Sequence, residues 1–582
     1  MKINTLLFVL LALPVISYGQ LFTKVTTGPV VTTGGDSRSV NFTDVNNDGW
    51  DDIFITNGPS AGGVNFLYLN NADGTFTKVT GDDLVTIASQ YDGATIADAD
   101  NDGDNDVLAV TWYDKPDYFF HNNGDGTFSY SGDNELSSHN GFSETASWGD
   151  YDNDGWLDAY VSNSEGDFKN FLYNNNGDGT FARITSGIAV TDAATSRGVT
   201  WADYDNDGDA DLYVTNESAE ANNLYRNDDG IFTKVTTGPL VSDNRSTMGA
   251  SWGDIDNDGD LDVYTVNSGY FASQKNQLYI NDGLGNFTEV ITGDAVTDGG
   301  CSYSSSFADY DNDGDLDLAV SNGFCNGTIL NFLYLNDGNG VFERDVNSIS
   351  DLVTPCSYGM AWGDANNDGF QDLLFATCKN TATGNNPDDL FFMNNGNGNN
   401  WIKFSLQGTA SNRSAIGARV KVKATINGNA VWQMREVTAQ SGHCSQNSLT
   451  VHFGLGDATV ADSVMVLFPA GNDTVLLNVA ADQLIDVIES SVTAVDEVNE
   501  AVTAISCYPN PAHDSFLILL GNKFLNDEKR ITLYDTTGRI VHVETLLPGV
   551  LSFAWTKNLP SGIYIIEVSA EREMERIKLI VE

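Results

Sequence analysis

A nine-residue pattern rich in aspartate recurs along most of the sequence. Its fullest copy reads DYDNDGDLD at residues 309–317. Seven copies begin at Asp44, Asp98, Asp150, Asp203, Asp254, Asp309 and Asp364. The starts lie 51 to 55 residues apart, and self-similarity at a steady period of about 50 residues is typical of repeat architectures.

Positions 1, 3, 5 and 9 of each copy carry side-chain oxygen, and position 6 is always glycine. Asparagine replaces aspartate at position 3 of the first and seventh copies. The oxygen-bearing residues, copy by copy, are Asp44, Asn46, Asp48 and Asp52; Asp98, Asp100, Asp102 and Asp106; Asp150, Asp152, Asp154 and Asp158; Asp203, Asp205, Asp207 and Asp211; Asp254, Asp256, Asp258 and Asp262; Asp309, Asp311, Asp313 and Asp317; Asp364, Asn366, Asp368 and Asp372.

Carboxylates gathered within nine residues repel one another in a compact loop unless a cation lies among them. A hard divalent cation that takes about six to eight oxygens fits best, with Ca²⁺ the first choice. The glycine permits the sharp turn, and the carbonyl of position 7 is expected to add a ligand. The patterns hold no sulfur or imidazole, which argues against zinc and copper. We therefore predict about seven Ca²⁺ sites, the alternative being seven solvated acidic turns without metal.

An EF-hand is the rival interpretation, because it also begins with alternating oxygen ligands. It requires a bidentate glutamate at position 12 and flanking helices. Position 12 here is Ile55, Ala109, Val161, Val214, Thr265, Val320 and Phe375. The flanks also read as strands, such as DAYVSN after the third copy. The loops are therefore predicted to connect β-strands.

Each repeat predicts four short strands, and seven such units describe a seven-bladed β-propeller. A large residue and then a small one precede each loop, as in Trp148 and Gly149. We expect the small residue on the crowded innermost strand and the large one between blades. Residues 21–30 resemble residues 231–240, so residues 22–26 are expected to complete the last blade and close the ring.

These repeats resemble the FG-GAP and VCBS repeats, which also form the integrin α-subunit propeller. The resemblance covers residues 21–400 and rests on the seven loops. It implies Ca²⁺ in loops on the outer rim and ligand binding on one face of the disc. The domain prediction is a propeller over residues 20–400.

Residues 401–487 form a second unit that resembles the ASPIC/UnbV domain. The match includes Asn412, Arg413, Gly417, Arg435, Glu436, Ser441, Gly442, Ser445, Gln446, Phe453, Gly454 and Gly456. Alternation in VKVKATI and SVMVLF predicts a small β domain. Arg413, Arg435 and Glu436 are expected to form either an internal ion-pair network or a small polar binding site.

Residues 488–504 are small and polar and are predicted to be a linker. Residues 505–582 contain YPNPA, ITLYDTTGRIV and LPSGIYIIEV in that order. This unit resembles the type A sorting domain of the type IX secretion system, which predicts a C-terminal β-sandwich handled by that machinery. A generic β-sandwich that stays attached is the alternative.

The first 19 residues read as a secretory signal peptide, with Lys2 before an apolar stretch and small residues before Gln20. We therefore expect a secreted or outer cell-surface protein. A net charge of −53 disfavours nucleic acid as a partner, and no later stretch is long and apolar enough to predict a membrane span. Matching positions in adjacent repeats predict the disulfides Cys301–Cys325 and Cys356–Cys378, with Cys444 and Cys507 free.

The favoured function is a non-enzymatic adhesion or recognition module for glycan or protein ligands. Its variable loops, residues 113–117, 216–222, 268–275 and 378–389, are expected to carry recognition. Tyr113, Tyr270 and Phe271 are candidates for stacking on sugars. The alternative is a polysaccharide lyase or hydrolase, for which His139 is the histidine best placed to reach a face. No catalytic residue is assigned, because the sequence shows no P-loop and no paired catalytic cysteine and histidine.

Overall fold

The computed structural model describes residues 20–58, 62–349, 352–379 and 383–489, together with 505–508, 516–520, 529–536, 538–546, 552–555, 559–570 and 574–581. The expected signal peptide and nearly all of the expected linker lie outside these ranges. Strands dominate the described chain, so the all-β prediction is confirmed. None of its described helices is long and apolar enough to cross a membrane.

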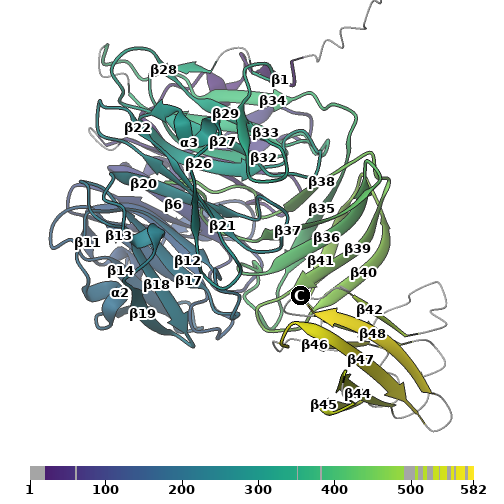
Figure 1. Ribbon diagram of the computed structural model, residues 1–582. Coiled ribbons are helices and arrows are strands. Elements are labelled where there is room, and N and C mark those ends of the chain that lie inside the picture. Colours follow the sequence, from purple (N-terminus) through teal and green to yellow (C-terminus); the bar gives the residue numbers. More distant parts are fainter. Residues whose placement is uncertain are drawn as a thin grey trace, which may run out of the picture.

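Residues 22–394 form four-stranded antiparallel sheets arranged as a β-propeller (Figure 1). From the centre outward the strands are β2 (Ser37–Thr43), β3 (Asp52–Asn57), β4 (Phe66–Asn70), β5 (Phe76–Lys78); β6 (Tyr91–Ala97), β7 (Asp106–Thr111), β9 (Tyr118–Asn122), β10 (Phe128–Tyr130); β12 (Ser143–Gly149), β13 (Asp158–Asn163), β14 (Phe171–Asn175), β15 (Phe181–Ile184); β16 (Ser196–Ala202), β17 (Asp211–Asn216), β18 (Asn223–Asp228), β19 (Ile231–Val235); β20 (Thr247–Gly253), β21 (Asp262–Asn267), β23 (Gln277–Ile280), β24 (Thr288–Val290); β26 (Ser302–Ala308), β27 (Asp317–Asn322), β29 (Phe332–Asn336), β30 (Phe342–Arg344); and β32 (Ser357–Gly363), β33 (Asp372–Thr377), β34 (Leu390–Asn394), β1 (Phe22–Lys24). We number these sheets as blades one to seven.

The first strand of each blade contacts the first strand of the next, and β32 contacts β2. The sheets therefore form a closed ring. Closure depends on β1, which pairs with β34 in the register Phe22↔Asn394 and Lys24↔Phe392. The expectation that residues 22–26 complete the last blade is confirmed for Phe22–Lys24, which form β1, and the outer edge of β34 is covered as a result.

Large residues of one blade pack onto small residues of its neighbour at the centre of the ring. A Cβ on Gly149 would lie 2.7 Å from Trp201 Nε1, and one on Gly363 would lie 2.5 Å from Phe42 Cγ. Both contacts are too close for a real Cβ, so glycine is needed there. The paired large and small residues before each loop thus set the spacing between blades.

Short elements connect the blades. The helical turns are η1 (Pro29–Val31), α1 (Asp83–Thr86), η2 (Glu135–Ser137), α2 (Ile188–Thr191), η3 (Pro239–Val241) and α3 (Asp294–Thr297). The two-stranded ribbons are β8 (Lys115–Pro116) with β11 (Asn140–Gly141), β22 (Gln274–Lys275) with β25 (Gly299–Gly300), and β28 (Ile329–Leu330) with β31 (Val353–Thr354).

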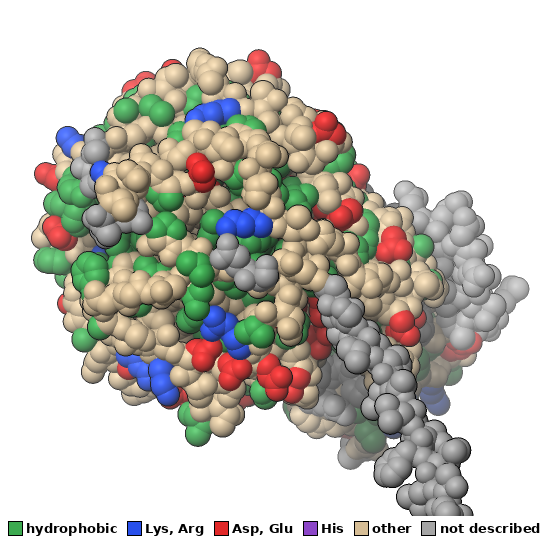
Figure 2. All heavy atoms as spheres, turned by 90° about the horizontal axis from the view of Figure 1, so that it is seen from above, with side chains coloured by type: hydrophobic (Ala, Val, Ile, Leu, Met, Phe, Trp, Pro, Cys, Tyr) green, Lys and Arg blue, Asp and Glu red, His purple; other side chains and the backbone are tan. Residues whose placement is uncertain are grey.

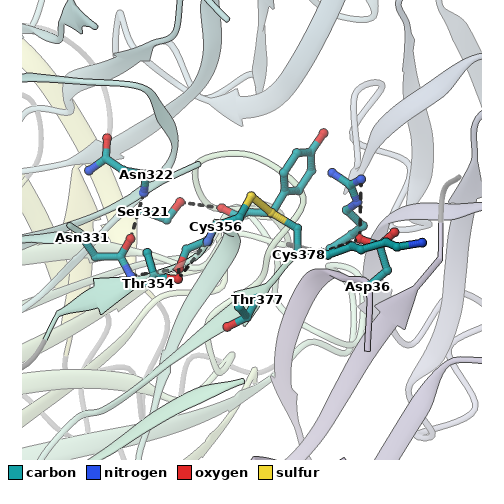
Figure 3. The surroundings of a disulfide bond; sticks show 12 residues. Asp36, Ser321, Asn322, Asn331, Thr354, Cys356, Thr377 and Cys378 are labelled. Atoms are coloured by element: carbon teal, nitrogen blue, oxygen red, sulfur yellow. Dashed lines mark hydrogen bonds and ion pairs between the residues drawn. A yellow bond between two sulfur atoms is a disulfide. The ribbon is translucent and has the colours of Figure 1, made fainter. Parts of the chain in front are cut away.

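Both predicted disulfides are present. Cys301–Cys325 and Cys356–Cys378 have Cα–Cα distances of 5.6 and 5.3 Å. The second lies beside Thr354 and Ser321 and close to Asp36 (Figure 3). Asp36 precedes the first strand of blade one, and its Oδ1 accepts a hydrogen bond from Lys379 N, the residue after Cys378. This disulfide therefore crosslinks blade seven next to blade one, where the ring closes. Cys444 and Cys507 are free and buried.

Two further β domains follow. The second domain has the sheets β38–β35–β41 and β37–β36–β39–β40, and the third has β42–β43–β46 and β45–β44–β47–β48. Their strands are β35 (Asn400–Gln407), β36 (Arg419–Ile426), β37 (Asn429–Glu436), β38 (Val451–Gly456), β39 (Val460–Leu467), β40 (Thr474–Ala480), β41 (Leu484–Ile488), β42 (Ser506–Tyr508), β43 (Phe516–Leu519), β44 (Lys529–Asp535), β45 (Ile540–Leu546), β46 (Ser552–Trp555), β47 (Gly562–Ser569) and β48 (Met574–Val581). In Figure 1 the second domain lies between the propeller and the third.

The second domain shares a hydrophobic core with the propeller. Phe404 and Phe453 belong to the same buried cluster as Trp148 and Phe181 of blade three. The third domain has a separate core around Trp555 and Ile566. Seen from above, the described residues of the propeller surface carry hydrophobic side chains in small groups among other side chains (Figure 2).

Candidate functional site

Each predicted metal-binding loop joins the two innermost strands of a blade, and backbone N–H groups orient its carboxylates. In blade four, Asp203 accepts hydrogen bonds from the N–H groups of Asp207 and Gly208, at 3.0 and 3.3 Å. Asp207 accepts one from Asp209 N at 3.0 Å. Asp211 accepts one from Asn227 N at 2.7 Å. Positions 1, 5 and 9 are therefore held in place by the fold.

The candidate ligands come together in the loops of blades two to five. There, ligand atoms of three residues lie within 4.8 Å of one another; the groups are Asp98, Asp100 and Asp102; Asp150, Asp152 and Asp158; Asp203, Asp205 and Asp211; and Asp254, Asp256 and Asp262. The remaining loops repeat the same backbone bonds to position 1, as from Gly49 N, Gly314 N and Gly369 N.

Several carboxylate oxygens in these loops are buried and have no hydrogen-bond partner among the residues that the structure describes. They are Asp152 Oδ1, Asp205 Oδ1 and Asp256 Oδ1 at position 3, Asp254 Oδ2 at position 1, and Asp317 Oδ2 at position 9. An ionised carboxylate can only accept, so a buried oxygen of this kind requires a donor or a cation. An all-oxygen set with free lone pairs fits a hard divalent cation such as Ca²⁺.

Burial raises the pKa of these carboxyls, and their like-charged neighbours add to the effect. The pKa rises to about 9 for Asp211 and Asp262 and to about 7 for Asp98 and Asp150. Without a cation the loops would retain protons near neutral pH. A bound divalent ion removes this cost because it favours the charged carboxylates.

A ring of asparagines links the loops, and sequence reasoning missed it. Position 4 is asparagine in every copy, with a left-handed backbone such as φ 60° at Asn206. Its Nδ2 donates to the loop of the next blade in each case; the acceptors are Asp104 Oδ1 for Asn47, Gly155 O for Asn101, Asp209 Oδ1 for Asn153, Asp260 Oδ1 for Asn206, Asp315 Oδ1 for Asn257, Gly369 O for Asn312 and Gly49 O for Asn367. The invariance of position 4 among the copies was the available signal.

A second set of asparagines, at the end of each third strand, also ties neighbouring blades together. Asn227 donates its N–H to Asp211 and its Nδ2 to Tyr151 O of the preceding blade, at 2.7 Å each. Asn394 does the same with Asp372 and Tyr310 O. The position 9 carboxylates are therefore part of the contact between blades as well as candidate ligands.

Two loops depart from the common pattern. In blade two, His121 Nδ1 lies 3.1 Å from Asp106 Oδ1 and 3.4 Å from Asp100 Oδ2. Its hydrogen bond to Asp106 raises the pKa of His121 to about 9. In blade seven, Lys403 Nζ lies 2.6 Å from Asp364 Oδ2, and both side chains are buried. These cations lower the net negative charge that a metal ion would meet there.

The second domain supplies cations to other loops too. Arg413 Nε lies 3.6 Å from Asp98 Oδ2, and Arg419 Nη1 lies 3.4 Å from Asp203 Oδ2. Gly454 N donates to Asp309 Oδ2 at 2.9 Å. The loops therefore face this domain, whereas the resemblance implied an outer rim. The expected ion-pair network is only partly internal: Glu436 pairs with Arg419 of the same domain at 2.8 Å, whereas Arg413 reaches Asp98 of the propeller.

Comparison with protein families gives the same order of units. Family models described as FG-GAP-like repeat match residues 44–109, 98–161, 160–214, 206–265 and 266–320. A model described as ASPIC and UnbV matches residues 408–494, and one described as secretion system C-terminal sorting domain matches residues 506–582. The chain carries FG-GAP-like repeats, an ASPIC/UnbV domain and a C-terminal sorting domain, in that order. The sorting domain indicates type IX secretion to the cell surface or the extracellular space.

Cartilage acidic protein 1 is a similar protein. The Homo sapiens protein is 26% identical over 340 residues, which cover 57% of this chain and 41% of that protein. The Xenopus tropicalis protein is 32% identical over 176 residues, covering 28% and 26%. The chain thus spans less than half the length of these relatives.

Solved propeller structures resemble the chain more distantly. YCF48 from Cyanidioschyzon merolae has a TM-score of 0.39 and 10% identity, and the match covers 64% of this chain and 98% of that one. The six-bladed β-propeller lectin of Aleuria aurantia has a TM-score of 0.34 and 12% identity, covering 53% and 95%.

A loop of the ASPIC/UnbV domain, residues 440–447, enters the centre of the FG-GAP propeller. Gly442 N donates to Ala250 O of blade five at 3.0 Å, and Gln446 N donates to Val40 O of blade one at 3.1 Å. The Gln446 amide also bonds both the N–H and the C=O of Ile96 in blade two. His443 and Cys444 are fully buried. This domain therefore fills the propeller axis from one side.

The other end of the strands carries the variable loops. Tyr113, Tyr270 and Phe271 are exposed, as predicted, at 40, 43 and 54%. Phe168 is exposed to 40% as well and was missed. All four have a positive φ, from 43° at Tyr270 to 72° at Tyr113, which is uncommon for aromatic residues and costs energy. Residues 380–382 of the predicted loop 378–389 lie outside the described residues.

A buried charged cluster lies among these loops and inner strands. Arg197 pairs with Glu144 at 2.6 Å and Glu217 at 2.8 Å. Tyr270 Oη donates to Glu217 Oε2 at 2.7 Å. Burial, together with the charge of Glu144, raises the pKa of Asp92 to about 8. The Tyr270 loop is therefore anchored to a polar centre, while its ring stays partly exposed.

His139 lies apart from this cluster. Its Nε2 is 3.6 Å from Glu135 Oε1, and its ring lies near Phe171 and Tyr173, with centroid distances of 6.4 and 6.3 Å. These contacts describe a histidine packed at the edge of blade three.

Proposed function

We propose that this protein is a calcium-loaded recognition module that binds a glycan or protein ligand outside the cell through the variable-loop face of its propeller. Ca²⁺ would occupy about seven sites, held by the four oxygen-bearing residues of each acidic loop. The carboxylate oxygens without partners and the hydrogen bonds between loops support this proposal, because acidic loops that hold Ca²⁺ would rigidify the inner hairpins around the ring.

One observation carries the recognition proposal: exposed aromatic side chains sit on strained loops at the same end of several blades. Tyr113, Phe168, Tyr270 and Phe271 all follow the second strand of their blade. Strained backbone in loops is a feature of binding sites, where the surrounding structure holds it. Aromatic rings provide large contact areas at low entropic cost, both for sugars and for proteins.

The loops also form a connected surface. Trp112 Nε1 donates to Ser164 Oγ at 2.9 Å, which links the loops of blades two and three. Asn326 Nδ2 donates to Phe271 O at 2.8 Å, which links blades six and five. A ligand that spans two loops would therefore meet a surface that is already ordered.

The test is binding of the mature chain, in millimolar calcium, to a glycan array and to extracellular proteins by pull-down. The variants Tyr113→Ala and Phe271→Ala should each reduce capture, because they remove exposed rings without touching a loop carboxylate. Ile291→Ala is the matched control, since Ile291 is exposed on the outer part of blade five. Equal capture by all four chains would refute the proposal.

A lyase or hydrolase is the alternative function. The raised pKa of Asp92 favours it, since a carboxyl that keeps its proton near neutral pH can act as a general acid. Polysaccharide turnover that is lost in Asp92→Asn and kept in Tyr113→Ala would support this function in place of binding alone.

A further inference from the structure

We propose that the acidic loop of blade two selects a divalent transition-metal ion, of which Zn²⁺ is the probe, over Ca²⁺, because His121 adds a nitrogen ligand to its oxygens. This selectivity presupposes the proposed function, in which the acidic loops hold divalent ions. Ligand atoms of Asp100, Asp106 and His121 lie within 4.8 Å of one another. The loop therefore differs in its chemistry from a set of oxygens alone.

His121 reaches the loop from β9, the third strand of the blade. It precedes Asn122, whose N–H donates to Asp106 Oδ1 at 2.8 Å. The same contact by an asparagine N–H identifies the equivalent residue in the other blades; these residues are Leu69, Asn174, Arg226, Ile280, Leu335 and Met393. None of them is a histidine. Because His121 lies outside the nine-residue pattern, the absence of imidazole from that pattern does not apply to blade two.

Two of these equivalent residues are polar, yet neither offers a free ligand atom. Arg226 has donors only, and it pairs with Asp228 at 2.8 Å. Asn174 Oδ1 already accepts a hydrogen bond from Tyr151 Oη at 3.0 Å. The nitrogen ligand is thus a property of blade two.

The distances around His121 are those of ligands that share a small ion. Its Nδ1 lies 3.1 Å from Asp106 Oδ1 and 3.4 Å from Asp100 Oδ2. Ligands bound at about 2.0–2.2 Å lie about 2.8–3.6 Å apart when they subtend right to tetrahedral angles at the metal. A ring N–H donates in one direction, so a hydrogen bond to Asp106 does not account for the approach of Asp100. Positions 3 and 9 of the loop and β9 therefore present ligand atoms to one point.

The ligand atoms decide which ion is preferred. Ca²⁺ takes oxygen ligands, whereas an imidazole combined with carboxylates suits Zn²⁺ and related ions. Asp98, Asp100 and Asp102 form a second group within 4.8 Å. Since Asp100 belongs to both groups, the two kinds of ion compete for one loop. In calcium alone, this loop would hold Ca²⁺ like its counterparts.

The site is open to solvent on one side. The side chains of His121 and Asp100 are 36% and 27% exposed, whereas that of Asp106 is fully buried. An ion can therefore enter from solvent and meet a fixed oxygen. Arg413 Nε, 3.6 Å from Asp98 Oδ2, offsets one of the loop's four carboxylate charges. A protonated His121 paired with the carboxylates is the competing arrangement, and a bound ion must displace that proton.

The test uses the mature chain without a histidine tag, in millimolar calcium with micromolar Zn²⁺. Equilibrium dialysis followed by elemental analysis counts both metals, and we expect one Zn²⁺ per chain. His121→Leu should weaken Zn²⁺ binding at least about tenfold and keep the bound calcium, because leucine occupies this position in blades one and six. His139→Asn is the matched control. It removes the other histidine of the propeller and should leave Zn²⁺ binding unchanged.

X-ray absorption at the zinc edge identifies the ligands in the wild-type chain, and we expect one imidazole among oxygens. A zinc shell without imidazole would overturn the proposal, as would equal Zn²⁺ binding by His121→Leu, which would indicate an adventitious ion only. Bound calcium with no bound Zn²⁺ would overturn it and leave the proposed function standing, whereas a chain that binds neither metal would refute both. If His121→Leu does not fold, the absorption spectrum of the wild-type chain decides the outcome.

Discussion

Asp117 allows a prediction that the equivalent residues of the other blades can check. Thr111 N, at the end of β7, donates to Asp117 Oδ1 at 2.8 Å, and Ser143 Oγ donates to Oδ2 at 3.0 Å. Five other blades place asparagine there; these are Asn65, Asn170, Asn222, Asn276 and Asn331. Asn170 accepts from Asn163 N at 2.8 Å and donates to Ser196 Oγ at 3.1 Å. Asp117→Asn should therefore fit without rearrangement.

The expected effect follows from the pKa of Asp117. Burial raises this pKa from 3.8 to about 7. The folded chain thus binds the proton more tightly than the unfolded chain. The resulting stability is complete below about pH 4 and is lost as the pH rises to about 7. The difference corresponds to at most about 4 kcal/mol. The asparagine variant never ionises, so its stability gain over the wild type should grow across this range.

The assay is urea unfolding of both chains at constant calcium, at several values between about pH 4 and pH 8. The comparison removes the titration of the acidic loops, because both chains share it. Asp389→Asn should behave alike in blade seven, where burial also raises the pKa to about 7. Asn170→Asp should show the opposite sign. A difference between Asp117→Asn and wild type that does not change with pH would refute this reasoning.

Three further predictions concern the ring. Chelation of calcium should lower the melting temperature in one cooperative step. At ~1 mM free ion and a Kd of ~0.1–1 mM, seven sites would stabilise the folded chain by roughly 3–10 kcal/mol in total. An unchanged melting curve would exclude the metal assignment. Asn206→Ala should lower the free energy of unfolding in urea by about 1–3 kcal/mol, since it removes hydrogen bonds to Asp260 Oδ1 and Gly283 O at 2.9 and 3.2 Å. An effect no larger than that of the exposed-site variant Asn71→Ala would contradict a stabilising role for the ring of asparagines. Replacing Cys356 and Cys378 by serine should lower the free energy of unfolding by about 2–4 kcal/mol, again measured by urea unfolding. Cys507→Ser is the control, because Cys507 is free and its replacement breaks no disulfide.

The propeller was predictable because its signals are local and repeated. Seven acidic turns, strand-like flanks and the matching segments at residues 21–30 and 231–240 are enough to predict a ring closed by the N-terminus. The pairing of Cys301 with Cys325 followed from equal registers in adjacent repeats. Even the asparagine at position 4 was visible as an invariant residue, although its Nδ2 acceptor in the next blade could be found only in three dimensions.

The junction between domains was beyond the reach of sequence reasoning. Arg413, Arg435 and Glu436 were recognised as a polar set, yet the partner of Glu436 is Arg419, and that of Arg413 is Asp98, more than 300 residues earlier. Nothing in the spacing of residues 440–447 indicates that they enter the propeller axis. Contacts of this kind depend on how two folded surfaces meet, so they leave no periodic pattern in either segment.

The same junction couples the metal sites to the ASPIC/UnbV domain. Lys403 contacts Asp364, Arg413 contacts Asp98 and Arg419 contacts Asp203, all at position 1 of an acidic loop. A bound ion holds the carboxylates of its loop in place, and so keeps a partner for each of these cations. If the loop of blade seven opened without its ion, a displaced Asp364 would leave Lys403 buried without its counter-charge, which is strongly unfavourable. Calcium bound in the propeller should therefore also stabilise the docking of the neighbouring domain.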